Sequence, residues 1–225
     1  MKILLSTAFL AILASSSPAQ TADSFGSGEG VEGRVLALVA QPDGKVVLGG
    51  SFTAVNGVPR QNLARVNADG SVDTTFIPQA VEGPNGPIAA LLLLPDGSII
   101  AGGDFTTAGN LNRSDLVKIA PDGKADATFG AQEGGVATNG SIAALARLPD
   151  GSIAVGGNFN TFYGLPRRGI AKILPDGTVA QATPSLPMLN GSVAALASTP
   201  AGGVVAGGEF TAPTQTAQSL LRLAK

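Results

Sequence analysis

Short apolar runs separated by polar turns recur along the whole chain. One stretch shows the pattern well: 87–94 ("PIAALLLL"), 98–106 ("SIIAGGDFT"), 115–120 ("DLVKIA") and 124–129 ("KADATF") have the length of strands, with "PDG" turns between them. Runs of this length bounded by Gly, Pro and Asp are typical of β-strands joined by tight turns. Since no window after the first residues shows a helical stripe, the pattern predicts an all-β chain.

These runs belong to an internal repeat. The segments "QPDGKVVLGGSFT", "LPDGSIIAGGDFT", "LPDGSIAVGGNFN" and "TPAGGVVAGGEFT" start at residues 41, 94, 148 and 199. The first glycine of each pair, at 49, 102, 156 and 207, recurs after 53, 54 and 51 residues. Four short strands in a repeat of about 53 residues are typical of a β-propeller blade. The repeats span approximately residues 33–83, 84–138, 139–189 and 190–225.

The two ends of the chain complement each other. The fourth repeat stops after its third strand, at "SLLRLAK" (219–225), whereas "TADSFGSG" (21–28) matches "DTTF" (73–76) and "DATFG" (126–130). An N-terminal strand within 20–28 could therefore complete the last blade and close the ring, which leaves no open sheet edge. We expect a closed four-bladed β-propeller.

The first residues, "MKILLSTAFLAILASSSPAQ", have an early lysine, an apolar run and then small residues. This order is typical of a signal peptide, and the apolar run is shorter than the roughly 20 residues of a membrane anchor. We expect a signal peptide over 1–19, a propeller over 20–225, no membrane span after cleavage, and secretion to the periplasm or the extracellular space.

Composition removes several classes of function. The 225 residues carry a net charge of −2, with no histidine and no cysteine. A nearly neutral chain offers no basic face for nucleic acid. Without histidine and cysteine there is no Ser-His-Asp triad, thiol nucleophile, thiolate metal site or imidazole metal site. We expect no cofactor, no resident metal, no catalytic residue and a monomer.

The repeat words "ALxxxPDGxIxxGGxFT" and "LARVNADGSVDTTF" resemble the bacterial delta-60 repeats, a β-propeller family of secreted and surface proteins. The resemblance covers residues 21–225, and the turn aspartate of the fourth repeat is replaced by Ala201. It implies a propeller fold and no particular activity.

The repeated glycine pair and the phenylalanine after it suggest close packing. A glycine pair inside an apolar strand marks a bulge or a close approach of another backbone. A phosphate-binding role is disfavoured because no helix follows the glycines. We expect the recurring phenylalanines to fill contacts between blades: Phe52, Phe105, Phe159 and Phe210.

Recurring charged residues allow two interpretations each. The aspartates of the "DG" turns fit turn chemistry, and "NADGSVD" (67–73) lacks the acidic series of a calcium loop. Third-strand cations recur at Arg65, Lys118, Lys172 and Arg222, as a ring that could hold an anion or as charges on solvated faces, which we favour. For the loop arginines Arg60, Arg113 and Arg167, pairing with the turn aspartates is favoured.

Two further groups are candidates for binding. Asp104 and Glu209 occupy the same repeat position in repeats two and four, where a closed ring would place them across a channel as a cation or carboxylate site. The loop 161–169 combines two aromatic residues with two cations, so it is the candidate recognition loop. Its residues are Phe162, Tyr163, Arg167 and Arg168.

Two classes of function follow. We favour a secreted, non-enzymatic binding or scaffold module whose partner is a protein, a glycan or an envelope component. The alternative is a propeller hydrolase or lyase that uses carboxylates or a bound cation at the central channel, since glycoside chemistry needs only two carboxyl groups. The single tyrosine and the absence of tryptophan weaken a sugar-stacking role.

Overall fold

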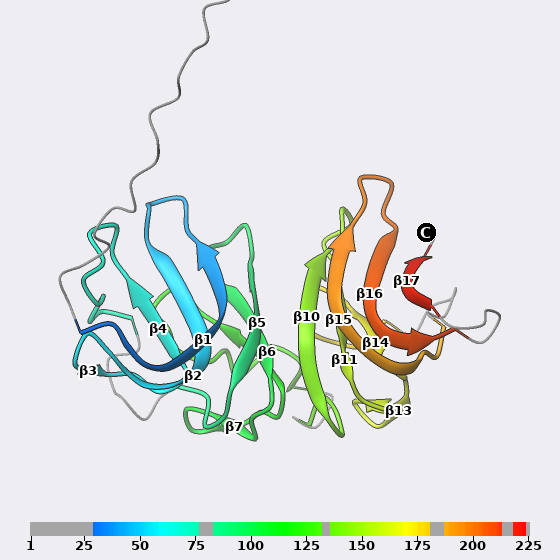
Figure 1. Cartoon of the computed structure of the whole chain (residues 1–225), viewed down its shortest axis with the longest axis horizontal. Helices are drawn as coiled ribbons and strands as arrows, with labels where there is room; N and C mark the ends of the chain where they lie inside the picture. Colours follow the sequence, from blue (N-terminus) through cyan, green and yellow to red (C-terminus); the bar gives the residue numbers. More distant parts are fainter. Residues whose placement is uncertain (1–28, 77–82, 132–135, 181–186, 213–217, 224–225) are drawn as a thin grey trace, which may run out of the picture.

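A computed structural model describes residues 29–76, 83–131, 136–180, 187–212 and 218–223 (Figure 1). The described residues form strands and turns, and none of them belongs to a helix long and apolar enough to cross a membrane. The all-β prediction is confirmed.

The strands fall into four successive groups, here called blades 1 to 4. Blade 1 contains β1 (Val31–Ala40), β2 (Val46–Val55), β3 (Val58–Pro59) and β4 (Leu63–Val66). Blade 2 contains β5 (Ile88–Leu93), β6 (Ile99–Gly103), β7 (Thr107–Ala108), β8 (Leu111–Asn112) and β9 (Leu116–Ile119). Blade 3 contains β10 (Ser141–Arg147), β11 (Ile153–Asn158), β12 (Thr161–Phe162), β13 (Leu165–Pro166) and β14 (Ile170–Ile173). Blade 4 contains β15 (Asn190–Ser198), β16 (Val204–Thr211) and β17 (Gln218–Leu223).

Each blade is an antiparallel sheet with the same order: an inner strand, a middle strand and a third strand. In blades 1 to 3 the predicted fourth strand is reduced to single bridges, Val66↔Val72, Ile119↔Ala125 and Ile173↔Val179. The two-residue strands form small hairpins, β7–β8 and β12–β13, which the sequence pattern did not predict. In Figure 1 these hairpins lie at the lower edge, opposite the β1–β2 and β15–β16 turns.

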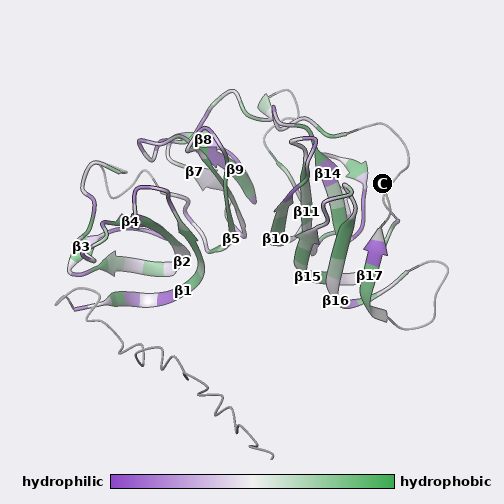
Figure 2. Cartoon of the chain, turned by 90° about the horizontal axis from the view of Figure 1, so that it is seen from above, coloured by the Kyte–Doolittle hydropathy of each residue, from purple (hydrophilic) through white to green (hydrophobic). Residues whose placement is uncertain are grey.

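The four blades follow one another in an open arc (Figure 2). The inner strand β5 contacts β1, β10 contacts β5, and β15 contacts β10. Among the described strands no comparable contact joins blade 4 to blade 1, which lie at opposite ends of the arc. The described residues therefore do not form the closed ring that we expected. The strand expected within 20–28 to complete the last blade lies outside them.

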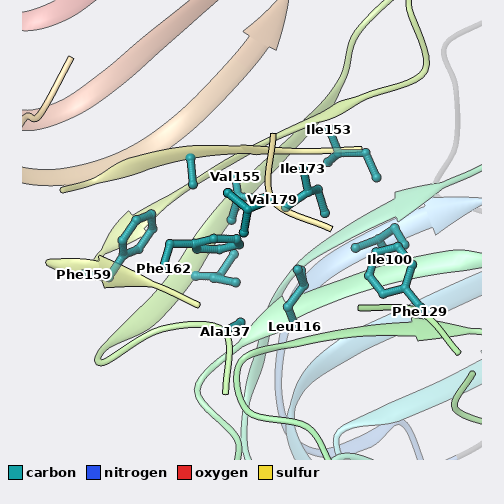
Figure 3. Packing of buried hydrophobic residues seen from close by; sticks show 12 residues of the cluster. Ile100, Leu116, Phe129, Ala137, Ile153, Val155, Phe159, Phe162, Ile173 and Val179 are labelled. Atoms are coloured by element: carbon teal, nitrogen blue, oxygen red, sulfur yellow. The ribbon is translucent and has the colours of Figure 1, made fainter. Parts of the chain in front are cut away.

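Apolar side chains of consecutive blades share common cores. One cluster joins Leu63 and Phe76 of blade 1 to Ile88 and Phe105 of blade 2. A second joins Leu116 and Phe129 of blade 2 to Phe159 and Phe162 of blade 3 (Figure 3). The third joins Ile170 of blade 3 to Val193 and Phe210 of blade 4. Three of the four recurring phenylalanines thus fill contacts between blades, as predicted, and Phe52 lies in a cluster within blade 1.

The glycine pair performs two tasks. The first glycine pairs with an inner-strand alanine in every blade: Ala37↔Gly49, Ala90↔Gly102, Ala144↔Gly156 and Ala195↔Gly207. The register shifts directly before each of these alanines, which places a β-bulge opposite the second glycine. A Cβ on Gly50 would lie 2.0 Å from the Arg34 carbonyl oxygen. Both sequence interpretations, a bulge and a close approach, are therefore correct.

Candidate functional site

The turn aspartates hold the tight turns. Ser98 donates its backbone N–H to an Asp96 carboxylate oxygen (3.0 Å), and the backbone N–H of Lys45 donates in the same way to Asp43 (3.1 Å). The glycine that follows each aspartate has positive φ, for example Gly97 at +80°. Hydrogen bonds from the Ser98 side chain hold the pKa of Asp96 at about 2. The predicted turn role is confirmed for these residues.

The third-strand cations do not face one another as a free ring. Lys118 Nζ lies 3.2 Å from Asp96 Oδ2, and Lys172 Nζ lies 3.0 Å from Asp150 Oδ2. Each of these pairs lies within one blade. Arg222 lies on β17, where its side chain is exposed. The repeat therefore places two of the four cations over the turn aspartates of their own blades.

Arg65 belongs to a more buried network at the junction of blades 1 and 2. Its Nε donates to Asp73 Oδ2 at 2.9 Å, and Lys45 Nζ donates to the same oxygen at 2.6 Å. Arg65 Nη1 donates to the Pro121 carbonyl of blade 2, and its guanidinium lies 4.4 Å from the Phe76 ring centroid. Although burial acts to raise the pKa of Asp73, hydrogen bonds from Lys45 and Thr75 and the charge of Arg65 lower it. This arginine stabilises a blade junction.

Asp104 and Glu209 are not brought together. Asp104 directly follows β6 in blade 2, Glu209 lies on β16 in blade 4, and blade 3 separates them. The prediction that these two carboxylates face each other across a channel required a closed ring, which the described residues do not form. Among the described residues no group of three or more acidic, histidine or cysteine side chains could hold a metal ion.

The structure shows one titratable group that sequence reasoning missed, Asp115. Its side chain is 5% exposed, its φ is +65°, and its Oδ2 accepts a hydrogen bond from Thr138 Oγ1 at 2.8 Å. Burial raises the pKa of Asp115 to about 6, and the nearby charge of Asp104 adds to the shift. Asn62 occupies the same place in blade 1, with φ +60° and a hydrogen bond to the Pro84 carbonyl. Both side chains therefore link a third strand to the segment that leads into the next blade.

The candidate recognition loop is partly core. Phe162 is fully buried, and its ring contacts Phe159 (5.7 Å between centroids) and Tyr163 (5.0 Å). Phe162 therefore does not contribute to the surface of the candidate recognition loop, because the β12–β13 hairpin turns this ring into the cluster between blades 2 and 3 (Figure 3). Tyr163 is half-buried, with its backbone N–H on the Ala137 carbonyl. Arg168 is exposed, so the surface of this hairpin is cationic rather than aromatic.

The loop arginines bind carbonyls. Arg60 and Arg167 donate from Nη1 to the carbonyls of Pro59 and Pro166, and Arg113 donates from Nη2 to the carbonyl of Ala127. The expected partners, the turn aspartates, lie at the opposite ends of the strands. The predicted pairing of these arginines with the turn aspartates is therefore wrong, because their spacing in the repeat does not show toward which end of the blade the side chains point.

A shallow hollow lies on the turn side of the arc. It has a volume of about 290 Å³ and lies among Pro42, Leu93, Leu94, Pro95, Gly97 and Arg147. Blades 1, 2 and 3 all contribute, and its walls are apolar except for the arginine. The sequence pattern did not identify it, because its lining residues come from three repeats.

Comparison with known families agrees with the fold. Residues 41–76, 94–129 and 148–179 match the model described as "Domain of unknown function (DUF5122) beta-propeller". The chain matches a β-propeller repeat family. These segments contain the turn, the glycine pair and the third strand of the first three repeats. No curated protein matches the sequence.

Three solved structures are similar to this chain. The WD40 β-propeller domain of Doa1 is 13% identical with a TM-score of 0.50, over 82% of this chain and 48% of that one. XC5397, a gluconolactonase from Xanthomonas campestris, is 15% identical (TM-score 0.44; 83% and 60% covered). PorZ of Porphyromonas gingivalis, a surface component of the type-IX secretion system, is 13% identical (TM-score 0.38; 80% and 26% covered). This chain spans less than two thirds of each, and the likeness to Doa1 shows the fold alone.

Proposed function

We propose that the chain is a secreted, non-enzymatic β-propeller module that binds an envelope component or glycan carrying acidic groups. One observation carries the proposal. The third-strand cations of blades 1 to 3 serve turns and a blade junction, whereas the β12–β13 hairpin carries two neighbouring arginines at its end, with Arg168 exposed. Variable loops on a rigid repeated scaffold are where binding specificity usually lies.

The hairpin is well built for this role. Phe162 anchors it in the core between blades 2 and 3, so the loop that follows has a fixed position. Arg167 Nη1 donates to the Pro166 carbonyl, which orients its guanidinium, and Arg168 extends from the same loop. Arginine pairs with carboxylates and phosphates through two parallel hydrogen bonds, so an acidic polymer is the chemistry that fits.

The experiment measures binding of the purified chain to immobilised acidic and neutral polysaccharides. We expect binding to the acidic polymer alone, and roughly tenfold or more weaker binding for Arg167→Ala/Arg168→Ala. Lys124→Ala is the matched control, since Lys124 is an exposed cation in a turn of blade 2. Equal binding by the double variant and the wild type, or equal binding to both polymers, would contradict the proposal.

The second candidate is a carboxylate-dependent hydrolase or lyase. What favours it is Asp115, a carboxyl group with a pKa of about 6 near Asp104, since a raised pKa suits a general acid. Against it, Asp115 is buried and hydrogen-bonded to Thr138, in the place that Asn62 occupies in blade 1. A panel of glycosides and lactones separates the two candidates: we expect no turnover, and turnover that Asp115→Asn abolishes would support the enzyme.

A further inference from the structure

The three blade junctions repeat one contact. The first glycine of each pair forms a socket for an apolar side chain of the next inner strand. A Cβ on Gly49 would lie 2.7 Å from Ile88 Cγ2, one on Gly102 2.5 Å from Ile142 Cγ2, and one on Gly156 2.6 Å from Val193 Cγ1. These three apolar residues are at most 1% exposed. The leucine three residues later covers the same glycine: Leu91, Leu145 and Leu196.

Each end of the arc carries one side of this contact without the other: blade 1 has the apolar side chains of the inner strand, and blade 4 has the glycine. In blade 1 the residues that correspond to Ile88 and Leu91 are Val35 and Leu38, which are 38% and 63% exposed. In blade 4 the socket glycine is Gly207, and the facing residue of its third strand, Leu220, is 66% exposed. The corresponding residues of the first three blades, Leu63, Leu116 and Ile170, are each 1% exposed.

We propose that the two ends of the arc bind a second copy of this chain, with blade 4 of each copy packed on blade 1 of the other. Val35 and Leu38 of one copy would then fill the socket at Gly207 of its partner and cover Leu220. The contact occurs twice around a two-fold axis, so two arcs close into one ring, as is usual for symmetric assemblies. A ring of eight blades lies within the size range of known propellers, about four to eight.

The repeat itself is the reason for choosing this occupant. An apolar surface complementary to Val35 and Leu38 already exists on the same chain, but it lies at the other end of the arc (Figure 2). A second copy of the chain presents this surface to Val35 and Leu38 without any change in the packing between consecutive blades. Leu48 and Phe52 on the middle strand of blade 1, and Ala64 on its third strand, are already buried in their own cluster, which confines the vacant contact to the inner strand. The proposed dimer differs from the monomer that we expected from the sequence.

The first test is the mass of the purified chain in solution, by sedimentation over a range of concentrations. We expect twice the mass of one 22.2 kDa chain. Leu38→Asp and Leu220→Asp should each give folded monomers, with dimer dissociation constants raised roughly tenfold or more. Leu174→Asp is the control, because Leu174 is 41% exposed in a turn of blade 3, and it should leave the dimer intact. A monomeric wild type would overturn the proposal.

The second test uses engineered cysteines, since the chain contains none. Val35→Cys with Gly207→Cys places one thiol on each end. At the equivalent inner positions, Cβ atoms on Gly102 and Ile142 lie 3.2 Å apart, close to the spacing of about 3.5–4.5 Å in a disulfide. Mild oxidation should give a covalent dimer. A bond within one chain, which indicates a closed four-bladed ring, overturns the proposal, as does no bond while the control pair Gly102→Cys/Ile142→Cys oxidises.

Discussion

The inner junctions and the free ends of the arc are built from the same residue types, yet they differ sharply in exposure. Leu116, at the junction of blades 2 and 3, is 1% exposed, whereas Leu220, at the same place in blade 4, is 66% exposed. Each of these leucines pairs with the first glycine of the glycine pair in its own blade, Leu116 with Gly102 and Leu220 with Gly207. Blade 3 packs over Leu116 in a shared cluster, whereas Leu220 has no further blade beside it among the described strands.

This comparison shows which part of the stability belongs to a blade and which belongs to a junction. Turns, bulges and strand pairing are complete within one repeat. Burial of the apolar faces is completed only by the next repeat, as expected when stability is a sum of repeat and neighbour contributions. Equivalent substitutions at an inner junction and at an end should therefore have very different effects.

The largest difference between an inner junction and an end is expected when a leucine is replaced by a charged residue. Leu116→Asp places a carboxylate in the cluster shared by blades 2 and 3, so it should destabilise the chain by about 4 kcal/mol or more and prevent folding. Leu220→Asp should change the free energy of unfolding of the single chain by less than about 0.5 kcal/mol. Urea titrations followed by circular dichroism at low protein concentration measure both. Similar losses for the two variants would contradict the equivalence of the two sites.

Filling the socket sharpens the same comparison. A Cβ on Gly102 would lie 2.5 Å from Ile142 Cγ2, so Gly102→Ala should cost about 1–3 kcal/mol through overpacking. Gly207→Ala, measured on dilute monomer, should cost less than about 1 kcal/mol, because among the described strands no further blade packs beside this glycine. Thermal unfolding of both variants checks this. A Gly102→Ala variant as stable as the wild type would show that the junction has room for an added methyl group, which would contradict this prediction.

A junction should also be sensitive to pH through Asp115. Its pKa in the folded state is about 6, above the ordinary value of 3.8, so the folded chain holds a proton that the unfolded chain releases. Stability contributed by the protonated carboxyl is present below about pH 4 and is lost as the pH rises through 6. Asp115→Asn, which introduces the residue that blade 1 has at Asn62, should remove this loss and stabilise the chain at pH 8 by up to about 3 kcal/mol, on the order of 1.4 kcal/mol per pKa unit.

The control for this profile is Asp96→Asn. The pKa of Asp96 is lowered to about 2, so its contribution is lost as the pH falls from 3.8 toward 2, which is the opposite direction. Urea titrations between about pH 2 and 8 resolve both slopes. If Asp115→Asn left the profile of the wild type unchanged between pH 4 and 7, the carboxyl would not be the titrating group.

The smallest effect is expected for the third-strand cations. Lys118→Ala removes an ion pair of 3.2 Å whose carboxylate is more than half exposed, so it should cost less than about 1 kcal/mol. Arg222→Ala, at the exposed end, should cost still less. Raising the salt concentration should reduce the difference between Lys118→Ala and the wild type, because screening weakens an exposed pair. A larger loss at Arg222 than at Lys118 would contradict the pairing within blades.

Much of the blade could be predicted from the sequence, because a turn or a bulge depends on neighbouring residues. The Asp-Gly turns and the paired glycines are of this kind. Ring closure depends on whether the faces of blade 1 and blade 4 meet, and the sequence of one repeat does not determine this. The burial of Phe162 could not be predicted from the sequence. An aromatic residue in a variable loop can lie on the surface or in the core, and the direction of the hairpin decides which. Asp115 could have been found by aligning Asn62, Asp115 and Gly169, which all adopt positive φ before the third strand.

The central claim is that the ends of the arc are unfilled halves of the blade junction. An experimental structure of the purified chain, in a crystal or by electron microscopy of the assembly in solution, tests it most directly. The account predicts Val35 and Leu38 packed over Gly207 of a second copy, with Leu220 buried. Val35 and Leu38 packed over Gly207 of the same chain, or both ends in solvent, would contradict it.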